Sequence, residues 1–269
     1  MTSVRHAAVA GLFYPGEADG LRAAVTGYLR EAAVDAGADA KGQGQAPKAL
    51  IVPHAGYIYS GPVAASAYVH LSGAAERISR VVLLGPAHRL PFDGLALPGA
   101  GGFETPLGVV PIDQDAIDRI APLPQVHDLP QAHAGEHSLE VHLPFLQTLL
   151  KSFSLLPLVV GSATAAEVAE VLDLLWGGEE TLIVISTDLS HYHDYDTAHA
   201  KDAATSAAIE ALDEGRIGFD DACGRIPVSG LLYAARAHGI TPRLVDLRNS
   251  GDTAGARDSV VGYGAYVLG

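Results

Sequence analysis

The sequence is poor in cysteine and in basic residues. It has one cysteine among 269 residues, so no intramolecular disulfide is possible, and this favours a reducing compartment such as the cytoplasm. There are 17 Lys and Arg against 31 Asp and Glu, a formal net charge of −14. Neutralising phosphates or an anionic lipid surface needs clustered basic residues, so neither a nucleic-acid partner nor membrane adhesion is expected.

The sequence also lacks an uninterrupted apolar run and a nucleotide-binding motif. The longest stretch without a charged residue, Ala49 to Ala75, contains two prolines and several glycines that would break a membrane helix. No signal-peptide cleavage pattern follows the N-terminus. No lysine-bearing phosphate loop is present, and no G-x-G-x-x-G follows a predicted strand. We therefore expect no membrane span and no nucleotide cofactor.

Short apolar runs rich in β-branched residues alternate with segments of helical spacing. Continuous apolar runs are typical of strands buried on both faces. The predicted strands are 49–52, 81–84, 156–160, 182–186, 244–247 and 260–268, and the predicted helices are 21–33, 62–71, 113–120, 143–150, 165–176, 198–212 and 228–238. The alternation predicts one α/β domain over residues 1–269, with a central, largely parallel mixed sheet flanked by helices. Residues 37–47 are interpreted as a surface loop and residues 91–111 as a long loop or irregular hairpin.

Three of the predicted strands end in a turn that bears a histidine. These residues are His54, His88 and His191. In open α/β sheets, ligands bind outside the carboxyl ends of the strands, so parallel strands would bring the three turns to one edge. A single histidine is more often structural, but three at equivalent strand ends indicate a site.

Two imidazoles at one edge are a partial metal site that needs an anionic ligand. The sequence offers Asp188, Glu136, Glu140 and Cys223 for this role. Cys223 precedes a predicted helix, whose terminal amides, together with Arg225, would favour a thiolate. The alternative is a buried, inert cysteine.

A second histidine cluster lies at residues 133–142. It contains H-x-x-E-H, which resembles the inverted zinc-protease signature, but a neighbouring proline and glycine argue against the continuous helix that this signature needs. We expect Ser138 to cap a helix, with His137 and Glu140 near its start, where they would bond to a substrate or orient metal ligands.

Asp188 and His191 stand three residues apart in a polar turn. A carboxylate beside a histidine raises its basicity and suits a general acid or base, although a solvated polar turn has the same composition. The remaining histidines without such a context, His6, His70, His127, His199 and His238, are interpreted as structural or surface residues.

Eight stretches, in order along nearly the whole chain, match a known family. They are Arg5–Pro15, Pro53–Tyr57, Gly85–His88, Phe103–Gly108, Glu136–Pro144, Ser186–His191, Cys223–Arg225 and Asp258–Tyr263. In them the sequence resembles the Memo family, which includes protein B of the AmmeMemoRadiSam gene group and is structurally related to class III extradiol dioxygenases.

The resemblance implies a class III extradiol dioxygenase-like α/β fold with a pocket at the edge of the sheet. It implies that His54, His88 and Cys223 form a metal site, in which a thiolate replaces the glutamate that the dioxygenases use. It also places His137, Asp188 and His191 in the same pocket. The gene group implies a functional link to a radical SAM enzyme and an AMMECR-type protein.

The leading hypothesis is a non-haem iron oxidoreductase, dioxygenase-like, acting on a small molecule or peptide. Fe(II) would be the metal, with zinc or copper as alternatives because a thiolate is a soft ligand. His191 and Asp188 would move protons, and His137 would stabilise oxyanion charge. Two other hypotheses stay open: a non-catalytic binding or signalling module that uses the same pocket, and a zinc-dependent hydrolase.

Overall fold

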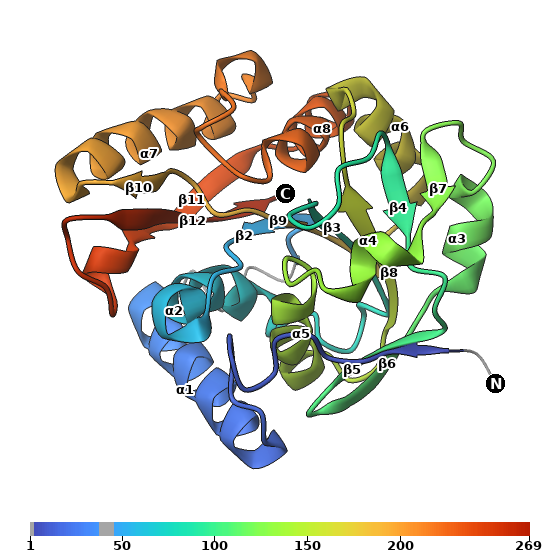
Figure 1. Ribbon diagram of the computed structural model, residues 1–269, viewed down its shortest axis with the longest axis horizontal. Helices are drawn as coiled ribbons and strands as arrows, with labels where there is room; N and C mark the ends of the chain where they lie inside the picture. The colour runs from blue at the N-terminus through green and yellow to red at the C-terminus, as the bar shows by residue number, and fades with distance from the viewer. Residues whose placement is uncertain (1–2, 38–45) are drawn as a thin grey trace.

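Four parallel strands form the centre of the main sheet. The computed structural model describes residues 3–37 and 46–269. In it, β2 (Ala49–Val52), β9 (Thr181–Ser186), β3 (Arg80–Pro86) and β8 (Ser154–Val160) lie side by side in that order (Figure 1). They are the continuous apolar runs of the sequence, and nearly every residue in them is buried. Their carboxyl ends therefore meet at one edge.

Antiparallel strands flank this parallel centre. On one side β12 (Val260–Leu268) pairs with β2, and both β10 (His191–His193) and β11 (Pro242–Asn249) pair with β12. On the other side β4 (Leu95–Leu97) runs antiparallel to β8 and parallel to β7 (Val126–Asp128). The nine-stranded sheet is thus mixed, as predicted, with its parallel pairing concentrated at the centre.

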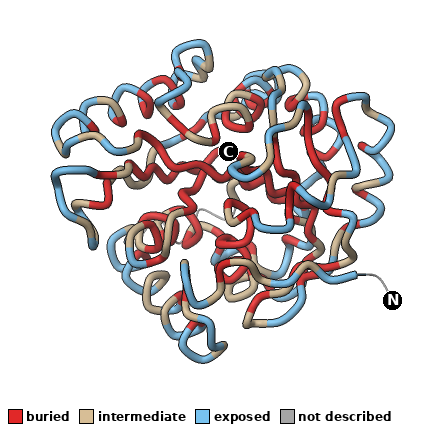
Figure 2. The backbone as a smooth tube through the Cα atoms, viewed as in Figure 1, coloured by how far each residue is buried: buried red, intermediate tan, exposed pale blue. Residues whose placement is uncertain are grey.

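Helices cover both faces of the sheet. Alternate strand residues pack on opposite faces of the sheet: Leu50 and Val52 belong to one apolar cluster, and Ala49 and Ile51 belong to the other. The first cluster includes residues of α1 (Ala18–Ala36), α2 (Tyr57–Tyr68) and α5 (Leu143–Leu149), and the second those of α3 (Gln114–Ile120), α6 (Ala165–Leu175), α7 (Tyr195–Glu210) and α8 (Arg225–His238). Figure 2 shows the sheet as a buried band between two partly exposed helical layers.

A small second sheet uses part of the segment 91–111. It consists of β1 (Val4–Arg5), β5 (Gly102–Thr105) and β6 (Gly108–Pro111), with β5 and β6 forming a hairpin. Of the two interpretations of this segment, a long loop or an irregular hairpin, the structure shows a hairpin, of regular register, and the segment also contributes β4 to the main sheet. Of the predicted loop 37–47, residues 38–45 lie outside the described residues.

The predicted strands and helices are all present, and the chain has a single-domain α/β fold with mixed sheets. In the described residues the remaining helices are α4 (Pro130–Ala134) and four 3-10 turns, η1 (Val69–Leu71), η2 (Glu140–His142), η3 (Glu214–Arg216) and η4 (Ser250–Asp252). Within the described ranges, no helix is both long and apolar enough to cross a bilayer.

Candidate metal centre

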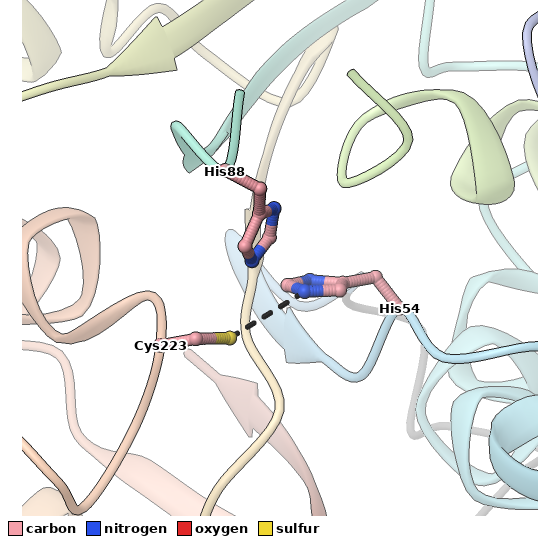
Figure 3. Close-up of side chains that lie close together, drawn as sticks. All are labelled: His54, His88 and Cys223. Atoms are coloured by element: carbon pink, nitrogen blue, oxygen red, sulfur yellow. Dashed lines mark hydrogen bonds between the residues drawn. The ribbon is translucent and has the colours of Figure 1, made fainter. Parts of the chain in front are cut away.

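The turns that follow the central strands bring the predicted site residues together. His54 comes two residues after β2, His88 two residues after β3, and Asp188 two residues after β9. Cys223 comes from the segment just before α8. In Figure 3 the side chains of His54, His88 and Cys223 point toward one another from three separate parts of the chain.

The three side chains are close enough to share one metal ion. One ligand atom from each of His54, His88 and Cys223 lies within 4.8 Å of the other two. The Cys223 Sγ is 3.4 Å from the His54 Nε2, and the two imidazole rings meet edge to face with centroids 5.2 Å apart. His54 is buried, whereas the His88 side chain is 29% exposed, so the group opens to solvent on the His88 side.

Each imidazole is held through its Nδ1 atom. The His54 Nδ1 is 2.6 Å from the Ser186 hydroxyl, and the His88 Nδ1 is 2.9 Å from a Glu136 carboxylate oxygen. Both Nε2 atoms are therefore left for a ligand role. Bonding of the second ring nitrogen to a hydroxyl or carboxylate is the usual arrangement around metal-bound histidines. Two oriented imidazoles and a thiol thus fit a borderline or soft metal ion such as Fe(II), Zn(II) or Cu(I).

Glu136 is an orienting group in this arrangement. Its carboxylate accepts hydrogen bonds from the backbone N–H groups of His88, His137 and Ser138 as well as from the His88 ring. Burial alone would raise the pKa of Glu136, but the bonds from His88 and Ser138 outweigh it and lower that pKa to about 2. A second possible ligand group, His88 with Glu136 and His137, would have to give up these bonds, which favours the group that contains Cys223.

Of the two interpretations of Cys223, a favoured thiolate and a buried thiol, the metal-free structure supports the buried thiol. Burial, followed by the nearby Asp188 carboxyl, raises the pKa of the Cys223 thiol to about 12. The Arg225 guanidinium does not compensate, because it lies over the Phe219 ring, 5.7 Å from its centroid. The thiol therefore keeps its proton until a cation replaces it.

The three predicted catalytic residues lie around this group. Asp188 is buried, accepts a hydrogen bond from the His54 backbone N–H at 2.7 Å, and has its pKa raised by burial. The His191 Nδ1 bonds to the Leu189 carbonyl at 2.8 Å, so a backbone oxygen and not Asp188 fixes that ring. His137 stacks on His88 with ring centroids 4.7 Å apart, and its buried Nδ1 has no hydrogen-bond partner among the described residues.

A pocket of about 1100 Å³ opens over these side chains. His54, His88, His137, Asp188, His191 and Cys223 all line it. Its other walls carry the aromatic Phe92, Tyr192 and Phe219, the cationic Arg89, Lys201 and Arg225, and the acidic Asp220. The site therefore has room for an organic molecule beside the metal-ligand group.

The histidine cluster at 133–142 does not form a protease helix. α4 ends at Ala134, and the His133 Nε2 bonds to the Ala96 carbonyl, away from the pocket. The expectation that Ser138 caps a helix is wrong, because its hydroxyl donates to the Pro86 carbonyl. Glu140 was expected near the site, but its buried carboxylate instead binds the N-terminal segment, with Arg5 among its partners.

Comparison with known proteins agrees with the sequence motifs. The Memo-like protein family matches residues 5–267. This chain belongs to the Memo-like family. A MEMO1 family protein of Methanothermobacter thermautotrophicus is 36% identical over 97% of this chain and 98% of its own length. Those of Aquifex aeolicus (36%, 97% of each chain) and Methanocaldococcus jannaschii (32%, 100% of each chain) are similar over the same extent.

A solved structure of an uncharacterized protein from Escherichia coli K12 is 14% identical, with a TM-score of 0.49 over 80% of this chain and 98% of that one. We draw no functional conclusion from that likeness.

Two buried residues of this Memo-like site were missed by sequence reasoning. Ser186 is the last residue of β9, and His142 lies at the end of η2. Both look like ordinary core residues in the sequence, since nothing in their spacing shows that Ser186 bonds to both His54 and His142. The only available signal was their place in motifs that the family shares.

Proposed function

We propose that this Memo-like protein is a non-haem iron oxidoreductase, dioxygenase-like, in which His54, His88 and Cys223 hold Fe(II). The observation that supports this best is that two imidazoles, each fixed through Nδ1, converge with a thiol at the wall of a pocket large enough for a substrate. Iron would supply redox chemistry that side chains lack, with O2 as the oxidant.

The surrounding residues would handle protons and charge. Burial raises the pKa of Asp188, so this pKa lies closer to neutral pH than that of an exposed aspartate. The carboxyl therefore suits proton transfer to a bound substrate. The His191 Nδ1 bonds to a backbone carbonyl, which leaves the Nε2 atom of the ring to act as a second proton carrier. His137 lines the same wall and would face charge that develops on the substrate.

The pocket walls favour an acidic substrate. Arg89 and Arg225 both line the pocket, and neither forms an ion pair with an acidic side chain in the described part of the chain. Lys201, by contrast, is paired with Asp221. Because unpaired guanidinium groups bind carboxylates well, we propose that the substrate is a small organic acid with an apolar or aromatic body.

Metal analysis of protein purified without oxygen tests the ligand assignment. The parent is expected to carry stoichiometric iron, and His88→Ala and Cys223→Ser are expected to lose it, because each removes one of three protein ligands. His127→Ala is the matched control, since His127 is exposed on β7, outside the pocket lining, and its loss should leave the iron content unchanged.

Oxygen uptake separates the iron oxidoreductase from the other hypotheses. Iron-loaded parent should consume O2 in the presence of an aromatic or aliphatic carboxylic acid from a screen, and the two ligand variants should not. Iron that stays in both variants would refute the ligand assignment. Ligand binding that survives metal removal, without O2 uptake, would favour a binding module instead.

A further inference from the structure

A buried chain of polar groups leads away from His54 into the core. The Ser186 hydroxyl has three neighbours within hydrogen-bond distance: the Ser138 carbonyl at 2.6 Å, the His54 Nδ1 at 2.6 Å and the His142 Nε2 at 2.9 Å. On the far side of His142, the Tyr68 hydroxyl is 3.0 Å from the Nδ1. All five residues are buried, so water cannot substitute for any of these bonds.

The single proton of Ser186 decides the direction of every bond in this chain. A carbonyl can only accept, and two oxygen atoms at 2.6 Å require a proton between them, so the Ser186 hydroxyl donates to Ser138. The Ser186 oxygen can then only accept further hydrogen bonds, so both imidazoles must donate to it. His54 therefore carries its proton on Nδ1, and His142 carries its proton on Nε2.

The other end of the chain agrees with this assignment. Burial lowers the pKa of His142 well below its usual value, so the ring is neutral and its Nδ1 must accept. Burial raises the pKa of Tyr68 well above its usual value, so its hydroxyl keeps the proton and can donate to that Nδ1. Stacking of Tyr68 on Phe145, with centroids 5.0 Å apart, holds the phenol in place.

We propose that Ser186 is a positioning residue that holds His54 in the Nδ1–H tautomer before any metal arrives, with His142 and Tyr68 holding the serine in place. The His54 Nε2 lone pair then faces the Cys223 sulfur at 3.4 Å, where a metal ion would bind. This inference deepens the proposed metal site, but its central claim concerns the metal-free chain.

The tautomers can be measured directly in the full-length, metal-free protein. Nitrogen-15 NMR of histidine-labelled chain distinguishes protonated from unprotonated ring nitrogens, with signals assigned by single substitution of His54 and His142. We expect a protonated Nδ1 at His54 and a protonated Nε2 at His142. A His54 ring protonated on Nε2 would overturn the proposal, whatever the fate of the metal site.

Ser186→Ala tests the positioning role. With the acceptor removed, the Nε2–H tautomer of His54 should gain population, and the Kd for Zn²⁺, used as a redox-inert probe, should weaken about 10- to 100-fold, as for other residues that orient metal ligands. Ser206→Ala is the matched control, because Ser206 is also buried and hydrogen-bonded, to the Tyr266 hydroxyl, on the other face of the sheet.

The outcomes separate this inference from the proposed function. An unchanged His54 tautomer in Ser186→Ala, with an unchanged Kd, would refute the role of Ser186. Failure of the parent to bind Zn²⁺ or iron would refute the metal site, while the parent NMR spectrum would still decide the tautomer. If Ser186→Ala does not fold, the parent spectrum alone confirms or overturns the assignment.

Discussion

The cysteine that completes the site is held by close contacts with the end of β9. The Cys223 N–H donates to the Asp188 carbonyl at 3.2 Å, and the Gly224 N–H donates to the Thr187 hydroxyl at 2.9 Å. A Cβ on Gly224 would overlap the Ser186 carbonyl and lie 2.7 Å from the Thr187 Cβ. Glycine is thus required here for close approach, and not for an unusual backbone angle.

We predict that Gly224→Ala weakens the metal site by moving Cys223 away from His54. The Kd for Zn²⁺ should rise at least tenfold, and the melting temperature should fall, because the new methyl group meets backbone and has no flexible neighbour to displace. Gly73→Ala is the control, since a Cβ there would meet nothing within 4 Å. A Gly224→Ala protein with parental metal affinity would contradict the prediction.

At the residue scale, the sequence shows which side chains can bind a metal but not what holds them. His54, His88 and Cys223 could be proposed from residue type, strand-end position and family motifs. The partners that orient them, Ser186 and Glu136, come from distant segments. The sequence left the protonation state of the thiol open for the same reason, since burial and the nearby Asp188 carboxyl outweigh the local sequence around Cys223.

At the scale of elements, helix α3 shows how one carboxylate can join several segments. The Asp113 side chain caps the helix by accepting from the Ala116 N–H at 2.9 Å, and it also accepts from Arg80 on β3 and Ser154 on β8. Burial by itself would raise the pKa of Asp113, but the Arg80 and Ala116 bonds outweigh it, so the pKa is lowered from its ordinary value of 3.8.

We predict a pH-dependent loss of stability for Asp113→Asn. A lowered folded-state pKa means that the ionised group contributes stability above the unfolded pKa, and that this contribution is lost as the pH falls through the folded pKa. The variant should be about 1 to 3 kcal/mol less stable in urea at pH 7. The difference should shrink below pH 4.

Asp115→Asn serves as the control for this measurement, because Asp115 is exposed in the same helical turn and makes no capping bond. Its unfolding free energy should change by less than about 0.5 kcal/mol at any of these pH values. A difference between Asp113→Asn and the parent that stays constant from pH 7 to pH 3 would contradict the linkage.

Elements with a long apolar pattern were predictable, and very short ones were not. β2, β3, β8 and β9 are continuous buried runs, and the sequence shows them clearly. The strands β1, β4, β7 and β10 have only two or three residues each, too few to show any period, and they exist because a neighbouring strand offers free backbone groups.

At the scale of the whole molecule, Glu140 joins the N-terminal segment to the site. Its buried carboxylate accepts hydrogen bonds from the Arg5 guanidinium, the N–H groups of Ala8 and Val9, and the Tyr14 hydroxyl. This attachment places Phe13 against His137, with ring centroids 4.8 Å apart. The first residues of the chain therefore support a wall of the pocket.

We predict that Glu140→Ala destabilises the protein by about 3 to 5 kcal/mol, because it leaves a buried guanidinium and several N–H and O–H groups without their acceptor. Urea unfolding measures the loss, and hydrogen exchange should show faster opening of residues 5–14. Glu104→Ala is the control, because Glu104 pairs with His6 at the surface and should cost less than about 1 kcal/mol. Equal effects from both substitutions would contradict the role of Glu140.

The α/β class followed from the alternation of strands and helices, but the directions of the outer strands did not. β12 and β11 are apolar enough to be predicted as sheet strands, yet nothing in their residues shows that β12 runs antiparallel to both β2 and β11. Pairing direction depends on how the connections pack, which a pattern of hydrophobicity does not record.

The positions of His54 and Cys223, 169 residues apart in the chain, also set an order of events during synthesis. Contacts over such separations form late in folding, and this one requires β2, β9 and the segment before α8 to be in place. A nascent chain therefore cannot assemble the proposed metal site until most of its length has left the ribosome. Cys223, the only thiol in the sequence, emerges late as well, and it is open to oxidation until it packs against the end of β9. Delivery of the proposed metal would therefore have to follow folding and outpace that damage.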